Sequence, residues 1–283
     1  MKQKINIVLS LFIFIFYSCN QITKSELQDE SIPIIEQFSS DTFQKKALFI
    51  FPHADDEAIC AGTISKLKEQ NYEVGVIVLT DQGKEVRHKE FIQSMNLLDV
   101  DYFEQLSVRN TNYNSWNDIM ENKIINWKGD TVSIKNMLVK KITDFKPSII
   151  FTWDNVIGGY GHPDHILLSQ IVNDIFDNQN KYLEDSNSIE KLYMISLSKG
   201  LENHILNKLD FYKGLISRYK QTEIPKPNIA VKISKYAIIK KKVLLAYRSE
   251  YKSALSKFFP SFKETDAKKY FELYDREYYI IKE

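Results

Sequence analysis

Short apolar runs alternate with helical patterns along most of this chain, and the alternation restricts the fold more than any other feature. The apolar runs cover residues 47–51, 74–79 and 147–153. Helical patterns of apolar positions cover residues 57–69, 87–98, 134–145 and 162–176. Repeated strand–helix alternation predicts an α/β fold, with a mostly parallel sheet, right-handed crossovers and helices on both faces.

The later part of the chain gives weaker signals. Apolar patterns predict further strands at 191–197 and 229–233, a short strand at 101–103 and a helix at 236–251. The tail from Phe258 to Tyr279 is rich in Phe and Tyr, which predicts core packing and capping of the sheet edge. Residues 110–130 lack periodicity and are long enough to form a functional loop over a site.

The N-terminus predicts export. Lys2 and Lys4 precede an apolar run at 5–17 that is too short to span a bilayer comfortably. The Ser18-Cys19 pair at its end is similar to the cleavage site of bacterial lipoproteins, although an ordinary secretory signal or a signal anchor would also fit. We expect a lipoprotein-type signal peptide at 1–18, a polar tether at 19–43 and a single domain at 44–283.

A lipidated Cys19 predicts a membrane-anchored lipoprotein of the bacterial cell envelope, either periplasmic or at the cell surface. Cys60 is the other of the two cysteines, so no internal disulfide could then form. The 38 basic and 37 acidic residues nearly cancel, which argues against binding nucleic acid through bulk charge. No G-x-G-x-x-G follows the first predicted strand, so a dinucleotide site is not expected either.

Two polar clusters follow predicted strands. The segment from His53 to Glu57 contains Asp55 and Asp56 directly after the first apolar run, and the segment from His162 to His165 follows the run at 147–153. In parallel sheets, ligands bind beyond the carboxyl ends of the strands, which is where both clusters lie. Adjacent buried carboxylates are costly unless something binds them, and a divalent cation would remove that cost.

The spacing is consistent with one metal site. His53 and Asp56 are three residues apart across a strand-to-helix turn, and His165 lies one helical turn after His162. Two histidines and one carboxylate, namely His53, Asp56 and His165, form a ligand set that suits catalytic zinc, although another divalent metal could bind. Asp55 would point away from the metal, and Asp55 and His162 would be left for acid and base chemistry.

Each signal also has an ordinary structural interpretation. Acidic residues at 55–57 stabilise the positive end of a helix, and Arg87 with Glu90 could form an i,i+3 ion pair of small value. His88 and His204 have no comparable neighbours and fit surface or hydrogen-bonded histidines. The second cluster supplies ligands that the first lacks, which favours chemistry.

The motifs in this order resemble the PIG-L family of N-acetylglucosaminyl deacetylases, also called LmbE-like. The matching segments are His53-Ala54-Asp55-Asp56-Glu57, then Arg87 with Glu90, then Gly161-His162-Pro163-Asp164-His165. The resemblance runs from about Lys46 to Phe176, with a fainter echo at 246–251. It implies a Rossmann-like fold and a zinc amidohydrolase that releases acetate from N-acetylglucosamine conjugates.

The resemblance also implies roles. His53, Asp56 and His165 match the metal ligands of the family, and Asp55 matches its general base. Ala54 departs from the usual Pro of the first motif, which loosens the turn but removes no ligand.

The remaining matches concern the substrate. His162 matches the residue that stabilises the oxyanion, and Asp164 matches the carboxylate that orients this histidine. Arg87 matches an arginine that contacts the substrate. Together these matches imply attack by water on the acetamide carbonyl, with Asp55 as the base.

The sequence therefore predicts a zinc-dependent hydrolase that removes the acetyl group from an N-acetylglucosamine-type amino sugar or glycoconjugate. An alternative is a glycan-binding surface lipoprotein with an idle hydrolase site, which the intact set of motif residues argues against. A different metallohydrolase, such as a phosphoesterase, is a further alternative, but two-metal sites usually need more carboxylates and histidines.

Overall fold

A computed structural model describes residues 22–39, 44–80, 84–106, 108, 131–183, 188–218, 220 and 223–283. The strands of this part form one eight-stranded sheet in the order β1-β7-β8-β6-β5-β2-β3-β4. Their bounds are β1 Ile34–Ile35, β2 Lys46–His53, β3 Glu73–Thr80, β4 Tyr102–Gln105, β5 Ile149–Trp153, β6 Lys191–Ser196, β7 Ile229–Lys232 and β8 Arg276–Lys282.

The sheet is mostly parallel, as predicted. β2 pairs in parallel with β3 and β5, β3 with β4, and β5 with β6. β1 also runs parallel to β7, whereas β8 runs antiparallel to both β6 and β7. The carboxyl ends of β2, β5 and β6 therefore lie along one edge, next to the start of β8.

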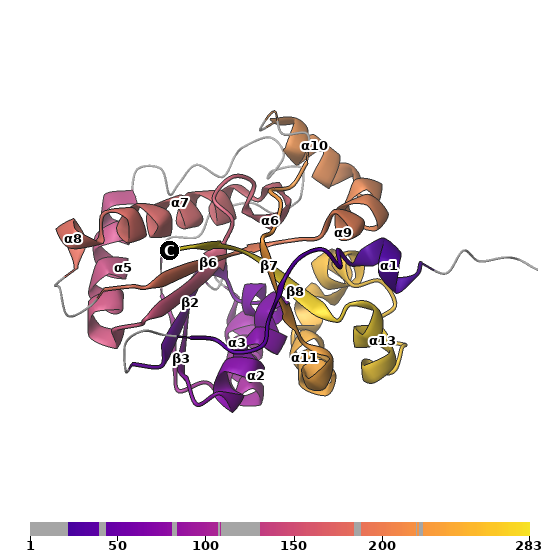
Figure 1. Cartoon of the computed structure of the whole chain (residues 1–283), viewed down its shortest axis with the longest axis horizontal. Helices are drawn as coiled ribbons and strands as arrows, with labels where there is room; N and C mark the ends of the chain where they lie inside the picture. The colour runs from indigo at the N-terminus through magenta and orange to yellow at the C-terminus, as the bar shows by residue number, and fades with distance from the viewer. Residues whose placement is uncertain are drawn as a thin grey trace, which may run out of the picture.

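Helices cover both faces of the sheet (Figure 1). On one side lie α5 and α7, and on the other α2, α3 and α11. The principal bounds are α2 Ala61–Glu69, α3 Glu85–Leu98, α5 Thr131–Phe145, α7 Pro163–Asp177, α9 Lys199–His204, α10 Asp210–Arg218, α11 Ala237–Ala246 and α13 Ala267–Leu273. Shorter ones are α1 Lys24–Leu27, α6 Gly158–Gly161, α8 Gln179–Tyr182 and α12 Ser256–Phe258.

The side chains of β2 alternate between two cores. Leu48 and Ile50 are buried in the core that contains α5 and α7. Phe49 and Phe51 are buried in the core that contains α2, α3 and α11, and the Phe49 ring stacks on Phe151 with centroids 4.3 Å apart. A strand covered on both faces needs apolar side chains at every position, which explains its unbroken apolar run.

Several expected elements differ in detail. The predicted helix at 57–69 begins as a 3₁₀ turn, η1 (Asp56–Cys60), before α2. The predicted helix at 236–251 ends at Ala246, and a 3₁₀ turn, η5 (Arg248–Glu250), follows it. The expected loop at 110–130 lies outside the described residues.

The aromatic tail is not confined to the sheet edge. Residues 276–282 form β8, which lies inside the sheet between β6 and β7. Its Tyr279 is completely buried. This segment therefore does not cap the edge as expected but forms a strand within the sheet.

Part of the range expected to be a tether belongs to the folded domain. Within 22–39, α1 packs near α9 and α13, and β1 pairs with β7. Leu27, Ile32 and Phe38 are buried, because they cover apolar surface of the domain. The predicted signal peptide and Cys19 lie outside the described residues. Among the residues described, no helix has the length and apolar character needed to cross a membrane.

Candidate metal centre and active site

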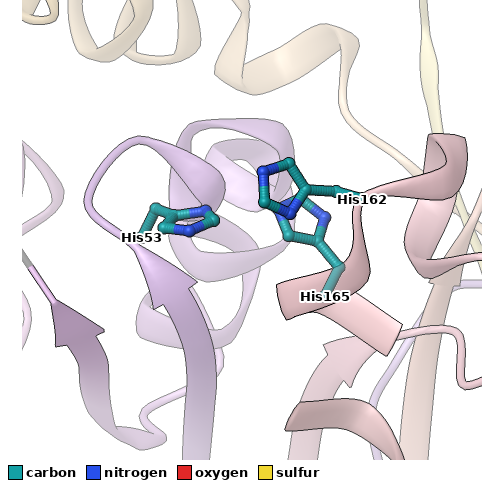
Figure 2. Close-up of side chains that lie close together, drawn as sticks. All are labelled: His53, His162 and His165. Carbon is teal, nitrogen blue, oxygen red and sulfur yellow. The ribbon is translucent and has the colours of Figure 1, made fainter. Parts of the chain in front are cut away.

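The two polar clusters meet at the carboxyl edge of the sheet. His53 is the last residue of β2, while His162 and His165 lie at the start of α7, just beyond β5. Figure 2 shows the three imidazoles gathered between these elements. Each ring offers a nitrogen atom, and these nitrogens lie within 4.8 Å of one another. All three side chains are buried.

The hydrogen bonds of His53 determine which nitrogen could bind a metal. Its Nε2 lies 3.0 Å from Oδ2 of Asp164. An ionised carboxylate can only accept, so His53 donates from Nε2 and keeps the lone pair on Nδ1. That Nδ1 lies 3.6 Å from Oδ2 of Asp56. A carboxylate on the far nitrogen of a histidine is the usual support of a metal ligand.

His165 is held in the corresponding way by the backbone. Its Nδ1 lies 3.0 Å from the carbonyl oxygen of Gly158, which can only accept, so Nδ1 donates and Nε2 carries the lone pair. Nε2 is buried without a hydrogen-bond partner and lies 3.3 Å from Oδ1 of Asp56. Two acceptor atoms thus face each other at a buried position, which is costly unless a cation lies between them or Asp56 carries a proton, and burial does raise the pKa of Asp56 well above its usual value.

Two of the separations are close to those of a tetrahedral metal site. Two ligands bound at 2.0–2.1 Å with tetrahedral angles lie about 3.3 Å apart. Oδ1 of Asp56 lies 3.3 Å from Nε2 of His165, its Oδ2 lies 3.6 Å from Nδ1 of His53, and the two histidines offer nitrogens within 4.8 Å of each other. Burial lowers the pKa of His53 to about 3 and that of His165 well below its usual value, which favours the neutral rings that metals require. The predicted set of His53, Asp56 and His165 is therefore brought together.

His162 has a different environment. It caps the N-terminus of α7, and its Nδ1 accepts the backbone N–H of Asp164 at 3.2 Å. The proton of the neutral ring must then be on Nε2. Burial lowers the pKa of His162 to about 3. The geometry also allows His162 as a third imidazole ligand together with His53 and His165, so two ligand sets are possible.

Asp164 contacts two of the three histidines. Its carboxylate lies 3.0 Å from Nε2 of His53, and its backbone N–H donates to Nδ1 of His162 at 3.2 Å. Burial lowers the pKa of the His162 ring, and the Asp164 carboxylate opposes this effect electrostatically. The implied role of Asp164 in orienting His162 stays a prediction.

Asp55 lies at the centre of a second polar group. Its backbone is in the left-handed region, with φ 111°, and its N–H donates to Oε2 of Glu57 at 3.1 Å. Its carboxylate lies 2.9 Å from Nη1 of Arg87. Burial raises the pKa of Asp55 to about 6, an effect that the Arg87 guanidinium opposes. A carboxyl group with a pKa near neutrality suits a general base.

Arg87 is 3% exposed and lies between two carboxylates. Besides Asp55 it approaches Glu250, whose Oε1 is 3.5 Å from its Nε. Glu90, which the sequence offered as its partner, instead accepts from the backbone N–H and the hydroxyl of Ser249 at 2.9 and 2.6 Å. The position of Arg87 supports the general-base candidate, and its contact with a substrate stays a prediction.

Sequence reasoning missed the contribution of residues 247–250, which we call the 247–250 segment. Its Tyr247 hydroxyl donates to Oε1 of the buried Glu57 at 2.5 Å, and the Ser94 hydroxyl donates to the same oxygen at 2.6 Å. Since Glu57 holds the N–H of Asp55, this segment reaches the base both through Glu57 and through the Glu250–Arg87 pair. The only signal was the fainter echo at 246–251.

The segment before α7 also holds the site, a role that the sequence did not predict. Asp154 accepts the backbone N–H groups of Val156 and Ile157 at 3.0 and 2.8 Å, which shapes the turn that presents the Gly158 carbonyl to His165. Gly159 has φ 79°, and a Cβ atom there would lie 2.4 Å from the Trp153 ring. Gly159 therefore packs closely behind the candidate metal ligand His165.

A cavity of about 490 Å³ lies next to these residues. His53, Asp55, Asp56, Arg87 and His162 line one part of it. Trp153 also lines it and stacks on His165, with centroids 4.7 Å apart. A concave site with convergent polar groups next to a potential metal centre can bind and hydrolyse a small polar substrate.

The chain is similar to several known proteins. Residues 48–176 match the PIG-L family model, described as GlcNAc-PI de-N-acetylase. A 1D-myo-inositol 2-acetamido-2-deoxy-alpha-D-glucopyranoside deacetylase from Nocardioides sp. is 28% identical over 158 residues, which are 44% of this chain and 51% of that protein. The chain thus spans about half the length of this curated relative.

Solved structures share the fold. The N,N'-diacetylchitobiose deacetylase from Pyrococcus horikoshii has a TM-score of 0.57 and 22% identity, covering 85% of this chain and 84% of that chain. The 4-carboxy-2-hydroxymuconate hydratase GalB from Pseudomonas putida has a TM-score of 0.54 and 11% identity, covering 84% and 96%. Because these two names denote different reactions, the shared fold does not by itself identify the chemistry.

Proposed function

Because residues 48–176 match the PIG-L family model, we propose that this chain is a zinc-dependent N-deacetylase. Its proposed substrate is an N-acetylglucosamine-type amino sugar or glycoconjugate. The observation that carries the proposal is the pair of buried acceptors, Oδ1 of Asp56 and Nε2 of His165, which face each other at 3.3 Å beside the Asp55 carboxylate. In a metal site, a bound cation would remove the repulsion between these two buried acceptors.

His53 through Nδ1, Asp56, and His165 through Nε2 would hold the ion. Two imidazoles and a carboxylate are a common catalytic zinc set, and other divalent metals accept the same donors. When bound, zinc supplies Lewis acidity that polarises a carbonyl and acidifies water. The His53–Asp164 and His165–Gly158 bonds orient the two rings for this purpose.

Asp55 acts as the general base. Arg87 and the N–H contact with Glu57 hold its carboxylate at the cavity wall, where it can take a proton from the water that attacks the acetamide carbon. The same carboxyl group can then return this proton to the departing amine. A positioned base of this kind is typically worth 10²- to 10⁴-fold in rate.

His162 stabilises the charge that develops on the carbonyl oxygen. Its Nδ1 accepts the N–H of Asp164, so the proton of the neutral ring is on Nε2, the atom that would donate to an oxyanion. Because the ring is fixed at the start of α7, it needs no reorientation during the reaction.

The proposal is tested by acetate release from a panel of N-acetylated sugars, with the full chain loaded with zinc and after chelation. We expect zinc-dependent release, and an Asp55→Asn variant that keeps its zinc but loses at least 10²-fold in rate. Asp210→Asn, at a fully exposed acid in α10, is the matched control and should behave as the parent does. Binding of the sugars without any acetate release would instead support the idle-site alternative and refute the enzymatic role.

Location is a separate part of the proposal. A lipidated Cys19 would attach the domain to the membrane of the cell envelope. α1 begins at Lys24, only a few residues later, and the segment 22–39 packs on the domain. Such an anchor would therefore hold the domain close to the membrane surface.

A further inference from the structure

The cavity beside the candidate metal centre extends well beyond it. Its lining passes from His53 at the end of β2, past Trp153 of β5 and Ser196 of β6, to Tyr278 of β8. These strands are neighbours in the sheet, and Ser196 pairs with Tyr278 in the β6–β8 register. Three strand spacings of about 4.8 Å give the cavity a length of about 14 Å along the sheet edge. A single sugar ring bound at the metal would leave the β6–β8 part empty.

One part of the lining is mostly apolar, and we call it the apolar arm. It begins close to the candidate metal centre, because the Phe258 ring packs on Tyr160, whose ring packs on His165, with centroids 4.9 and 5.1 Å apart. It is formed by α9, the turn after α9, and the segment that ends in α12. Its principal lining residues are Leu197, Leu201, Leu206, Leu255, Phe258 and Phe259. Leu201 and Phe258 are partly exposed, so the arm is open apolar surface rather than closed core.

Most polar side chains along the arm already have partners. Arg276, which also lines the cavity, donates from Nη1 to the carbonyl oxygen of Asp29 at 3.0 Å, and its Nε lies 3.5 Å from the Asp275 carboxylate. The Ser196 hydroxyl donates to the carbonyl oxygen of Pro225 at 2.5 Å, and the Tyr278 hydroxyl donates to Gln28 at 2.5 Å. Lys240 and Glu277 form an ion pair with each other. A sugar hydroxyl placed here would lose its water without gaining a comparable partner, which is costly.

Resting on the proposed deacetylase function, we propose that the apolar arm binds an alkyl or aryl group of the substrate. The substrate class is then an N-acylated amino sugar that carries an apolar group in addition to the sugar. That group has two chemical sources, the aglycone or the N-acyl chain, and both would present the same hydrocarbon surface to the arm. The residues that form the arm lie outside 48–176, the range that matches the family.

The test measures the effect of chain length in two substrate series. One series is methyl, butyl and hexyl N-acetylglucosaminide, and the other is glucosamine with N-acetyl, N-butanoyl and N-hexanoyl groups. Each buried methylene is worth up to about fourfold, so we expect kcat/KM to rise at least about tenfold along one series. The series that responds identifies the source of the apolar group.

Two variants connect the effect to the arm. Leu201→Asn makes its wall polar and Ala254→Phe reduces its volume, so each should bring the ratio of long-chain to short-chain kcat/KM towards one. Leu209→Asn is the matched control, because Leu209 is a partly buried leucine of the same region that does not line the cavity. It should leave the ratio unchanged.

Calorimetric binding of the alkyl glycosides separates this inference from the proposed function. If short substrates are hydrolysed but neither series gains in rate or affinity with length, the apolar arm is refuted and the deacetylase stands. If no acyl group is released from any substrate, the deacetylase fails. The arm is then judged by affinity alone, and equal affinity for methyl and hexyl glycosides would overturn it.

Discussion

The hydroxyl of Tyr247 offers a sharp test of how Asp55 is positioned. Tyr247 is completely buried and donates to Oε1 of Glu57, whose Oε2 holds the backbone N–H of Asp55. Tyr247→Phe removes only this hydroxyl, so it leaves the ring packing nearly intact. The perturbation therefore acts on the base through one intermediate residue, which makes Tyr247 a positioning residue.

The magnitude follows from the contacts. A hydrogen bond to a charged group contributes about 1.5–3 kcal/mol, and Ser94 still donates to the same Glu57 oxygen, so about 1.5 kcal/mol is expected. That loss should lower Tm by about 3–6 °C. Asp55 occupies a left-handed backbone conformation that the surroundings must stabilise. If most of the lost hydrogen-bond free energy is expressed as poorer positioning of Asp55, kcat decreases about tenfold while KM stays within about twofold.

The assay combines thermal melting with kcat and KM for acetate release. Tyr212→Phe is the matched control, since Tyr212 is also a buried tyrosine that donates to a glutamate, Glu202 at 2.8 Å, but does not line the cavity. It should lower Tm by a similar amount and leave kcat unchanged. Equal kcat values for the two variants would refute the positioning role of Tyr247.

Three other perturbations have defined outcomes. Chelation should lower Tm by about 5–10 °C, because a metal present at 100 times its Kd contributes about 2.7 kcal/mol to stability. Added zinc should restore the original Tm. A Tm that chelation leaves unchanged would contradict the metal site. Glu277→Ala leaves Lys240 as a buried, unpaired cation and should cost about 3–5 kcal/mol in urea unfolding, whereas adding Lys240→Met should recover only the part due to the unpaired charge, because the N–H groups of Gly62 and Thr63 still lack their acceptor. Metabolic labelling of the full chain with palmitate in a bacterial host should mark the parent and Cys60→Ser but not Cys19→Ser, and equal labelling of all three would exclude lipidation at Cys19.

The strands and helices that pack on both faces of the sheet could be predicted because their periodicity is local. β2 and β3 are apolar at nearly every position, since two helical layers cover them. β8 could not be predicted from the same rule. Glu277 interrupts its apolar pattern, and the burial of that carboxylate depends on distant partners, namely Lys240 and the backbone N–H groups of Gly62 and Thr63.

The meeting of the two motif clusters could also be predicted, because the topology places the carboxyl ends of β2 and β5 side by side. The hydrogen bonds that hold the candidate metal ligands could not be predicted. The Asp164 carboxylate lies against His53, 111 positions earlier, and this contact depends on side-chain orientation within the folded site. Sequence spacing contains no information about that orientation.

The residues outside 48–176 explain why a family match predicts this site only in part. The matched range contains the candidate ligands and base. Tyr247 and Glu250 contact Glu57 and Arg87 beside the base, but they follow α11, whose sequence has no feature that distinguishes it from other amphipathic helices. The apolar arm is built from the same later part of the chain. The candidate ligands and base therefore come from the two motifs, whereas the surfaces that enclose them come from the later part of the chain. If the proposed function holds, exchanging the residues after 176 should change the preferred substrate more than the metal dependence.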